Sequence, residues 1–448
     1  MLVLGQILEV ISAVLGAWLM VMLVYQLYLT IFGFRRETKD YADHAPQSRF
    51  LVLVPAHNEE AVIGDIIDNL NGMDYPRELY DFYIIADNCT DQTAQVARDR
   101  GAKVIITQKD GPDAPTGKPI ALRKALESLG DYENRYDLMM IFDADNLMDR
   151  NMFREVNSQY LDKDKPDFIQ CYLGAKNKKG VVAWFYYTSY TITNRFFQLA
   201  KHRRGLNCSI GGTGYAMSTA YLRQRGGWTT MSLTEDFEIQ VEATLEGKRI
   251  LWNHNTRVYD EKPTRLRASM RQKLRWGQGH WFVCLRNTGK VFRSLFQRKI
   301  SLREFISVFT YMYSLSSYVV AALQLVISLL LMIPGFQHVT EPESLTSLLV
   351  GAALFVYSYF ALFYLADWLD NRIGFKLTTL PLMVVSFVLN MLVAVVNQVV
   401  GLLLCRRQST WVKTEHTLCR QELAAQDMGK DPAEGVDKST EEGVASQV

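Results

Sequence analysis

The sequence predicts an α/β domain that is attached to a membrane by helices on both of its sides. Residues 48–252 alternate short apolar runs with amphipathic stretches, which is typical of a sheet covered by helices. Apolar segments long enough to cross a bilayer lie before and after this region. The length of 448 residues also exceeds what one hydrophobic core usually fills, so a second structural component is expected.

The first segment, residues 1–34, is predicted to be a transmembrane anchor. From Ile7 to Phe34 its only charge is Glu9, and a run of this length covers the roughly 30 Å hydrocarbon core of a bilayer. It has no basic front region and no small-residue cleavage site, so we expect it to be retained. Three cations follow closely: Arg35, Arg36 and Lys39. By the positive-inside rule they place the next domain in the cytoplasm.

Residues 48–260 are predicted to form that cytosolic α/β domain. Four apolar runs are expected strands: FLVLVPA (50–56), FYIIADNCTD (82–91), AKVIITQ (102–108) and DLMMIFDAD (137–145). In sheets of this class, ligands gather beyond the carboxyl ends of the strands. Polar clusters follow the first, second and fourth runs, at 56–59, 87–91 and 143–145.

The Asp-x-Asp pattern at Asp143 and Asp145 is a candidate metal site. Five apolar residues precede it, so both acids would be held rigidly at a strand end, where carboxylate oxygens suit a hard cation such as Mg²⁺ or Mn²⁺. A second copy, Asp162 and Asp164, has no strand before it and is interpreted as a solvated loop. Such a metal site is usually completed by phosphate oxygens of a substrate.

Three motifs around these strand ends offer groups that suit a nucleotide: VPAHNEE (54–60), DNCTD (87–91) and the lysine of TGKPIAL. The candidate donor-binding residues are Pro55, Asn58, Glu59, Asp87, Asn88, Asp91, Lys118 and Asp143. An alternative reading remains open for the first motif. Asn58 would then be the N-cap of the following helix, with Glu59 and Glu60 favoured in its first turn.

Residues 261–304 are basic and aromatic and are expected to form interfacial helices. Within SMRQKLRWGQGHW (269–281), Gln272 and Arg275 are three apart and therefore share one face of a helix. Arginine offers a planar fork that binds a phosphate through two hydrogen bonds. The alternative is an amphipathic helix whose Arg275 and Trp276 meet only lipid headgroups.

Residues 305–404 are predicted to be transmembrane and interfacial helices. Phe305–Pro334 and Leu345–Trp368 are each long enough to span a bilayer. Thr378–Leu404 is equally apolar but carries three amides, Asn390, Asn397 and Gln398. A third full span would put the chain after it outside, against its arginines, so a tilted or partly inserted helix is preferred. The acidic tail 421–448 is expected to be disordered.

Charge and cysteine usage narrow the class of protein. The net charge of +2 argues against nucleic acid as a partner, because phosphate neutralisation needs a concentrated basic face. The six cysteines form no CxxC pair and no Cys/His ligand spacing, so they are interpreted as reduced cytosolic thiols.

Six motifs occur in an order that resembles glycosyltransferase family two: LVPAHNEE, ADNCTDQT, GKPIAL, DAD, TED (234–236) and QKLRW (272–276). The chain looks like the membrane-embedded, processive branch, which includes the cellulose, chitin, hyaluronan and poly-N-acetylglucosamine synthases. The resemblance covers residues 50–276. It implies a Rossmann-like GT-A catalytic domain, a nucleotide-sugar donor and inversion at the anomeric carbon.

The resemblance also implies roles for single residues. Asp236 matches the family's catalytic base, and Glu235 would position it or the acceptor; as an alternative, the Thr-Glu-Asp motif merely caps a helix. Gln272 and Arg275 would meet the diphosphate at the membrane interface, and Trp276 would form the acceptor platform.

Two further segments are candidates for shaping the site. In SIGGTGYAMS (209–218), Gly212 and Thr213 would let the backbone approach the sugar or acceptor. In residues 405–420, the run STWVKTEH resembles the gating loop of the synthases through Trp411, Lys413 and Thr414. The alternative for this run is a juxtamembrane anchor with its tryptophan at the interface.

The resulting prediction is a multi-pass enzyme of the plasma membrane. It would transfer glucose or N-acetylglucosamine from a UDP-sugar to a growing β-linked polysaccharide, with coupled translocation through its own spans. Some relatives need an accessory export subunit. The alternative is a single transfer to a lipid acceptor, and a non-enzymatic scaffold is disfavoured because Asp87, Asp143, Asp145 and Asp236 are all present.

Overall fold

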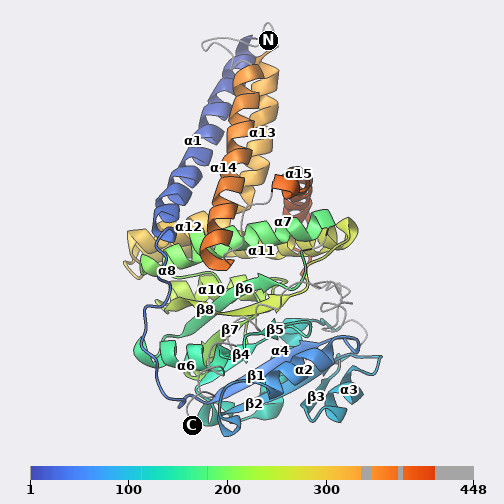
Figure 1. Cartoon of the computed structure of the whole chain (residues 1–448). Coiled ribbons are helices and arrows are strands. Elements are labelled where there is room, and N and C mark those ends of the chain that lie inside the picture. Colours follow the sequence, from blue (N-terminus) through green and yellow to red (C-terminus); the bar gives the residue numbers. More distant parts are fainter. Residues whose placement is uncertain (1, 112–113, 179, 334–344, 372–376, 409–448) are drawn as a thin grey trace, which may run out of the picture.

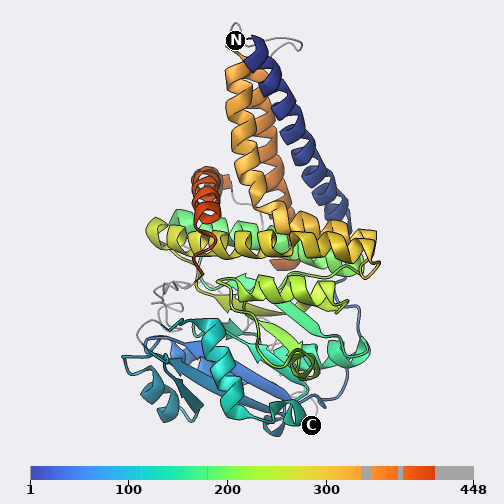
Figure 2. The ribbon, with the colours of Figure 1, turned by 180° about the vertical axis from the view of Figure 1, so that it is seen from behind.

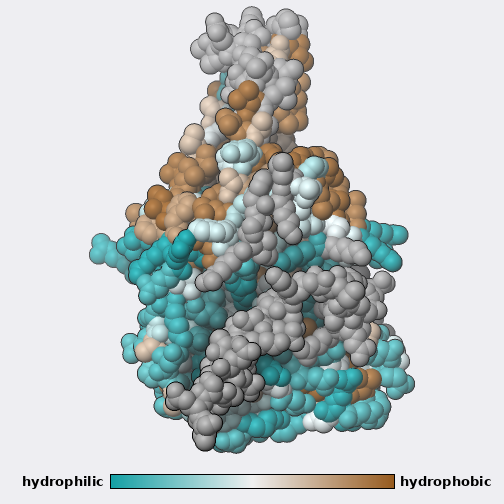
Figure 3. Space-filling view, in the orientation of Figure 1, coloured by the Kyte–Doolittle hydropathy of each residue, from teal (hydrophilic) through white to brown (hydrophobic). Residues whose placement is uncertain are grey.

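The computed structural model describes residues 2–111, 114–178, 180–333, 345–371 and 377–408. Three layers are stacked along the long axis of the molecule (Figure 1). A stalk of upright helices stands on a layer of helices that lie across it, and a sheet domain lies beneath that layer. Hydrophobic surface covers the stalk and the helices at its foot, whereas the sheet domain is mainly hydrophilic (Figure 3).

The sheet has eight strands in the order β3-β2-β1-β4-β7-β6-β8-β5. Their bounds are β1 Phe50–Ala56, β2 Tyr80–Asp87, β3 Lys103–Thr107, β4 Leu138–Ile141, β5 Leu147–Met148, β6 Phe168–Ala175, β7 Tyr215–Ser218 and β8 Ile250–Asp260. The four expected strands are β1 to β4, and they pair in parallel. β7 runs antiparallel to both of its neighbours, β4 and β6.

Helices cover both faces of this sheet, which explains why β1 is apolar throughout. Val52 and Val54 pack into a core that includes α2 (Ile63–Asn71) and α6 (Met152–Asp162). Leu51 and Leu53 point into the opposite core, with α4 (Lys118–Leu129), α9 (Thr219–Arg225) and α10 (Glu235–Leu245). A strand buried on both faces reads as a continuous apolar run. The short helices α3 (Thr93–Asp99) and α5 (Tyr132–Arg135) complete the domain.

The layer at the foot of the stalk consists of α7 (Gly180–Thr193), a π-helical turn (Asn194–Leu199), α8 (Ala200–Arg203), α11 (Leu266–Phe296) and α12 (Leu302–Ser314). α15 (Leu380–Leu404) packs on α11 and α7. Both views show α15 foreshortened, so it runs across the upright helices and not alongside them (Figures 1 and 2). Its depth in a membrane stays a prediction.

The stalk contains α1 (Leu2–Gly33), α13 (Ser316–Leu331) and α14 (Leu345–Asn371) (Figure 1). Among the described residues, Val3–Gly33 and Leu380–Leu404 are long and apolar enough to cross a membrane, and α12 with α13 makes a third span if the bent pair counts as one. The sequence predicted that Phe305–Pro334 is long enough to span a bilayer, and the structure divides this run between two helices. The chain bends by 64° at Leu315, where the flanking hydroxyls of Ser314 and Ser316 bond backward to carbonyls of Tyr311 and Tyr313.

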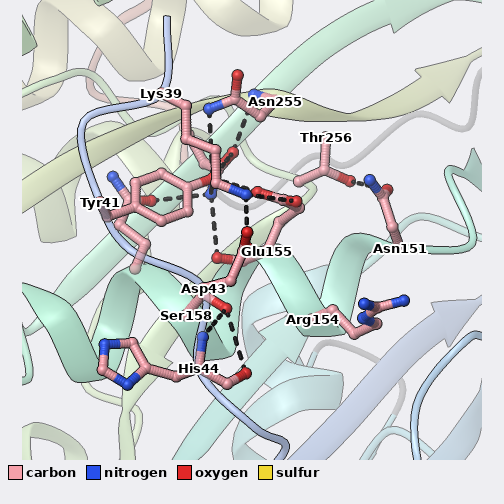
Figure 4. A network of polar contacts seen from close by, with 12 residues as sticks. Lys39, Tyr41, Asp43, His44, Asn151, Arg154, Glu155, Ser158, Asn255 and Thr256 are labelled. Carbon is pink, nitrogen blue, oxygen red and sulfur yellow. Dashed lines mark hydrogen bonds and ion pairs between the residues drawn. The ribbon is translucent and has the colours of Figure 1, made fainter.

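Between α1 and β1, residues 39–44 run along the sheet domain and are bonded to it (Figure 4). We call this segment the strap. The Lys39 ammonium lies 3.1 Å from a carboxylate oxygen of Glu155 on α6. The Tyr41 hydroxyl donates to the same carboxylate, and the Asn255 amide donates to Tyr41. The backbone N–H of His44 donates to Ser158 on α6 at 3.0 Å. This strap fixes where α1 leaves the domain.

A buried ionic cluster joins the stalk to the sheet. Arg195, in the π-helical turn, is fully buried and forms an ion pair with Asp370 near the end of α14. The Arg195 guanidinium also donates to the carbonyl of Gly33, the last residue of α1, at 3.0 Å. His254 of β8 lies 3.0 Å from the same Asp370 oxygen. The ends of two stalk helices are therefore held on one strand.

Candidate active site

The loops that follow β1 and β2 are joined to each other by their own polar groups. Asn58 adopts a left-handed backbone conformation (φ 55°), and its side-chain oxygen accepts the N–H of Thr90 at 2.7 Å. Asp91 accepts the N–H of Glu60 at 3.2 Å. α2 begins only at Ile63, so the alternative that made Asn58 its N-cap is wrong. Asn58 instead joins the first two strand ends.

Asp87 ends β2 and is buried, with 7% of its surface exposed. One of its carboxylate oxygens accepts from Thr107 and from Asn88, each at 2.8 Å. The backbone carbonyl of Asp87 also lies 2.7 Å from Nδ1 of His57 in the first loop. Pro55 and Glu59 lie on or directly after β1, beside these loops. The first two predicted donor-binding motifs therefore meet at one edge of the sheet.

Lys118, the first residue of α4, links the Asp-x-Asp motif to α10. Its ammonium lies 2.6 Å from an oxygen of Asp143, 2.6 Å from the carbonyl of Gly212 and 4.0 Å from an oxygen of Glu235. Burial alone would lower the pKa of Lys118, but Asp143 and Glu235 raise it above its usual value. Lys118 therefore keeps its charge between acids that are distant in sequence.

Asp145 is buried deeper than Asp143. Its carboxylate accepts the backbone N–H of Glu261 at 2.7 Å, directly after β8. Burial raises the pKa of the neighbouring Asp260, the ion pair with Lys262 opposes that effect, and the charges of Asp145 and Asp143 add to it. Acids from the ends of β4 and β8 therefore lie close enough to repel one another.

The Thr-Glu-Asp motif opens α10, with Thr234 at the N-cap position. The Thr234 side chain makes no capping hydrogen bond, so simple capping does not account for the motif. Burial raises the pKa of Glu235 to about 7 and also raises the pKa of Asp236. Lys118 and Arg275 oppose both shifts. Gly212 approaches this end with φ 79°, and a Cβ placed on it would lie 3.0 Å from an Asp236 oxygen.

α11 brings its motif to the same place from the side of the stalk. The Gln272 side chain accepts the hydroxyl of Tyr186 on α7 at 3.0 Å, and the ring of Trp276 packs edge-on against Tyr186 at 6.2 Å. Arg275 has a buried Nε without a hydrogen-bond partner in the described structure. Its charge acts on both acids of α10. The structure thus brings Arg275 beside acids that the sequence places 40 residues earlier.

A family model described as "Glycosyltransferase like family 2" matches residues 46–279, which is just over half of the chain. The chain belongs to this family. Its matched region includes every motif from the first strand to the Gln-x-x-Arg-Trp segment of α11. It is therefore a family 2 glycosyltransferase, and its sheet domain has the GT-A-like fold.

Curated relatives of this family 2 glycosyltransferase include three kinds of protein. A probable glycosyltransferase YdaM of Bacillus subtilis is 24% identical over 304 residues, which is 65% of this chain and 70% of the relative. A beta-monoglucosyldiacylglycerol synthase of Synechocystis is 25% identical over 282 residues, 59% of this chain and 56% of the relative. A poly-beta-1,6-N-acetyl-D-glucosamine synthase of Staphylococcus epidermidis is 20% identical over 264 residues, 59% of this chain and 62% of the relative.

Among solved structures, the fold is similar to that of a mannosyltransferase from Pyrobaculum calidifontis, solved with GDP-Man and Mn²⁺. The TM-score is 0.57 at 18% identity, and the match covers 81% of this chain and 96% of that chain. At this identity the likeness shows the fold alone.

The sequence analysis did not predict that charged residues at the end of β8 join the site. Lys262 is 2% exposed, pairs with Asp260 at 2.6 Å and lies 3.6 Å from the ring centre of Tyr190 on α7. The run DEKP at 260–263 gave a usable signal, because it places an acid and a cation directly after an apolar strand.

The charges of this site fit a divalent cation. Five acids (Asp143, Asp145, Glu235, Asp236 and Asp260) lie near three cations (Lys118, Lys262 and Arg275), so acids outnumber cations among these residues. The described residues contain no group of three or more His, Cys, Asp or Glu arranged as metal ligands. A metal at Asp143 and Asp145 would therefore need further oxygens, which a diphosphate supplies.

The predicted gating residues Trp411, Lys413 and Thr414 lie outside the described residues. The chain directly before them lies beside the site. The Gln408 side chain accepts the N–H of Leu233 at 2.9 Å and donates to the carbonyls of Cys405 and Gln278. Gln408 thereby ties the end of α15 to the loop that leads into Thr234-Glu235-Asp236.

Proposed function

We propose that this glycosyltransferase transfers a hexosyl group from a UDP-sugar to a hydroxyl at the membrane surface, with inversion of the anomeric carbon. The observation that carries the proposal is the position of Asp236 in the first turn of α10, where Lys118 lies 4.0 Å from the neighbouring Glu235 and the charge of Arg275 acts on both acids. A base and a diphosphate-binding cation are the two groups that an in-line displacement needs on opposite sides of the sugar.

Asp236 is the proposed general base. It would take the proton of the acceptor hydroxyl as that oxygen forms a bond to the anomeric carbon and the bond to the diphosphate breaks. Its backbone neighbour Phe237 donates an N–H to one oxygen at 2.8 Å, which leaves the other oxygen on the side of Gly212. Glu235, held by Lys118 at 4.0 Å, would position the base.

Arg275 and Lys118 would stabilise the UDP leaving group. One further negative charge develops on the diphosphate as its bond to the anomeric carbon breaks, and preorganised cations in a partly buried site stabilise such charge effectively. Asp143 and Asp145 would hold Mg²⁺ or Mn²⁺, which supplies further charge stabilisation to the diphosphate oxygens when it is bound. The joined loops at Asn58, Asp87, Asn88 and Asp91 would receive the uridine.

The first candidate acceptor is a membrane lipid that carries a free hydroxyl. Trp276 and Tyr186 lie in the helical layer at the foot of the stalk, where a lipid headgroup reaches the site without leaving the bilayer. The glucosyldiacylglycerol synthase relative supports this acceptor class. The second candidate is a growing β-linked polysaccharide, supported by the poly-N-acetylglucosamine synthase relative and by an aromatic platform. This second function includes translocation and an accessory export subunit.

The deciding experiment uses the full chain reconstituted in vesicles with Mn²⁺ and radiolabelled UDP-glucose, UDP-galactose or UDP-N-acetylglucosamine. Vesicles with and without diacylglycerol are compared, and products are separated by chain length. The Asp236→Asn variant is the matched blank. A single-sugar glycolipid that requires diacylglycerol supports the first acceptor, and a polymer supports the second. Transfer from GDP-mannose without transfer from any UDP-sugar would reject the donor class.

A further inference from the structure

The C-terminal half of α11 has three distinct faces. Val283, Cys284 and Val291 pack into a core with Phe237 and Val241 of α10. Leu285, Phe292 and Phe296 recur at positions i, i+7 and i+11 and so share the face opposite to that core. They are 56%, 39% and 81% exposed. A soluble helix would bury or replace such residues, so this face needs an apolar environment.

The exposed apolar face is turned toward the side from which the stalk rises. α10 lies between α11 and the sheet, so the face opposite to α10 looks away from the sheet domain (Figure 1). Phe292 packs edge-on against Phe305 and Phe309 of α12, with ring centres 5.1 Å and 5.5 Å apart. The hydrophobic band at the foot of the stalk therefore extends along α11 and into α12.

Three cations flank this apolar surface or follow it along the chain: Arg293, Arg298 and Arg303. We call them the basic edge. All three are exposed, and none forms an ion pair with any acid in the part of the chain that the structure describes. Arg286, two turns before Arg293, differs because it pairs with Glu238 at 3.2 Å. The basic edge thus carries charge that the protein itself does not use.

The basic edge is continuous with the foot of α1. The Arg303 guanidinium donates to the carbonyl of Arg204 at 3.4 Å, and Arg204 itself lies over the ring of Phe32 at 4.6 Å. Phe32 lies in the last turn of α1, the helix predicted to enter the bilayer. Cations placed at that depth lie at the level of lipid phosphates, which attract each Lys or Arg by about 1 kcal/mol in an anionic leaflet.

We propose that the basic edge binds the headgroups of acidic phospholipids in the leaflet that α1 enters. The apolar face of α11 inserts among the acyl chains while the flanking cations meet the phosphates, an arrangement typical of helices that lie in the interface. Because α11 also carries Arg275 and Trp276, the lipid would hold in place the same helix that completes the transfer site. The binding itself requires neither a sugar donor nor transfer.

The test measures lipid retention by the detergent-purified full chain. The chain is incubated with equal amounts of phosphatidylglycerol and phosphatidylcholine of the same acyl chains, and native mass spectrometry counts the bound molecules. Wild type should retain mainly phosphatidylglycerol. The Arg293→Gln/Arg298→Gln variant should lose about fivefold in phosphatidylglycerol retention for each cation removed. Raising the salt concentration should release the lipid from wild type, because exposed charges are screened.

A matched control removes two exposed cations elsewhere. Arg98→Gln/Arg223→Gln changes α3 and α9 in the sheet domain, so it alters net charge equally and should leave retention unchanged. Equal loss in both double variants, or equal retention of the two lipids by wild type, would overturn the proposal. Displacement of the lipid by inorganic phosphate alone would also overturn it, because the apolar face would then contribute nothing.

Discussion

Lys118 contacts acids from two parts of the chain, Asp143 at the end of β4 and Glu235 at the start of α10. The pair with Glu235 is long, at 4.0 Å, and Glu235 is buried, with 7% of its surface exposed. A buried acid that has only a distant cation keeps its proton up to a higher pH. The pKa values of the two acids of α10 are therefore higher than those of exposed carboxylates. Such raised pKa values are common where acid–base chemistry occurs.

At this residue scale, Asp236→Asn should lower the transfer rate by about 10²–10⁴-fold, because an amide cannot accept the acceptor's proton. Binding of the UDP-sugar should persist, since Lys118, Arg275 and the first two strand-end loops are unchanged. Turnover is measured as UDP release, and donor binding is measured by calorimetry. Near wild-type turnover would reject the base assignment.

Glu235→Gln should change the pH dependence of stability. The pKa of Glu235 is raised to about 7, so the folded chain holds that proton more tightly than the unfolded chain does. The resulting stabilisation is complete below the usual pKa of 4.5 and is lost as the pH rises through about 7. Glutamine stays neutral and does not suffer this loss. The Tm of the variant minus that of wild type should therefore increase between about pH 4.5 and pH 7 in thermal scans, and a constant difference would contradict the raised pKa.

Most of these residues could be identified from the sequence because their motifs occur in a fixed order. Residues that reach the site only through the way the chain folds could not be identified in this way. Asp143, Asp145, Asp236 and Arg275 do lie together. Lys262 was missed although the run DEKP follows an apolar strand, because its contact with Tyr190 depends on how β8 ends beside α7. The roles of all these residues in transfer stay predictions.

At the scale of single elements, α11 and α15 cross with their backbones in close contact. A Cβ on Gly401 would lie 2.8 Å from the backbone of Gly277, and a Cβ on Gly277 would lie 3.0 Å from the carbonyl of Asn397. The indole N–H of Trp281 donates to the carbonyl of Gln398 at 3.1 Å. Glycine allows this approach because it has no side chain to separate the backbones.

Gly401→Ala should therefore push α15 away from α11 and lower stability by about 1–3 kcal/mol. It should also reduce transfer, because the displacement breaks the contact of Gln408 with Leu233 beside the base. Thermal unfolding and UDP release measure the two effects. Gly289→Ala on α11 is the control: nothing lies within 4 Å of its Cβ, so it should stabilise the helix by roughly 0.5–1 kcal/mol. Equal behaviour of the two variants would contradict the close crossing.

Element boundaries were predictable where periodicity was strong and unpredictable where composition was uniform. The four parallel strands were found because turn residues and acids end each run. The bend at Leu315 was missed because the run from Phe305 is apolar on both sides of it, and only the serine hydroxyls distinguish its position. An apolar run of bilayer length shows that a segment is long enough to span, but it does not show whether the helix bends or how it is tilted.

For the whole molecule, a buried ion pair is part of the join between the stalk and the sheet. Arg195→Ala would leave Asp370 buried beside His254 and without its ion-pair partner, and removing one partner of a buried pair costs about 3–5 kcal/mol. The Tm should fall accordingly. Arg35→Ala, at an exposed pair with Glu37 near the same junction, should have little effect. A similar change in both variants would show that the buried cluster does not hold the stalk.

The overall arrangement was only partly accessible from sequence. Apolar runs and the cations after α1 predicted a membrane protein with a sheet domain, and the family comparison confirms the glycosyltransferase domain. Nothing in the order of residues indicated that Arg195, Asp370 and His254 would meet, because they come from three distant segments.

The strap from Lys39 to His44 and the Arg195 cluster together give α1 two independent attachments to the sheet domain. Both attachments lie at the end of α1 nearest the sheet domain, so they limit how far that end can move. With α1 seated in a bilayer, Asp236 would stay at one constant height above the lipid surface throughout the reaction cycle. The enzyme would therefore accept only those acceptors whose hydroxyl projects from the membrane by the distance that reaches Asp236.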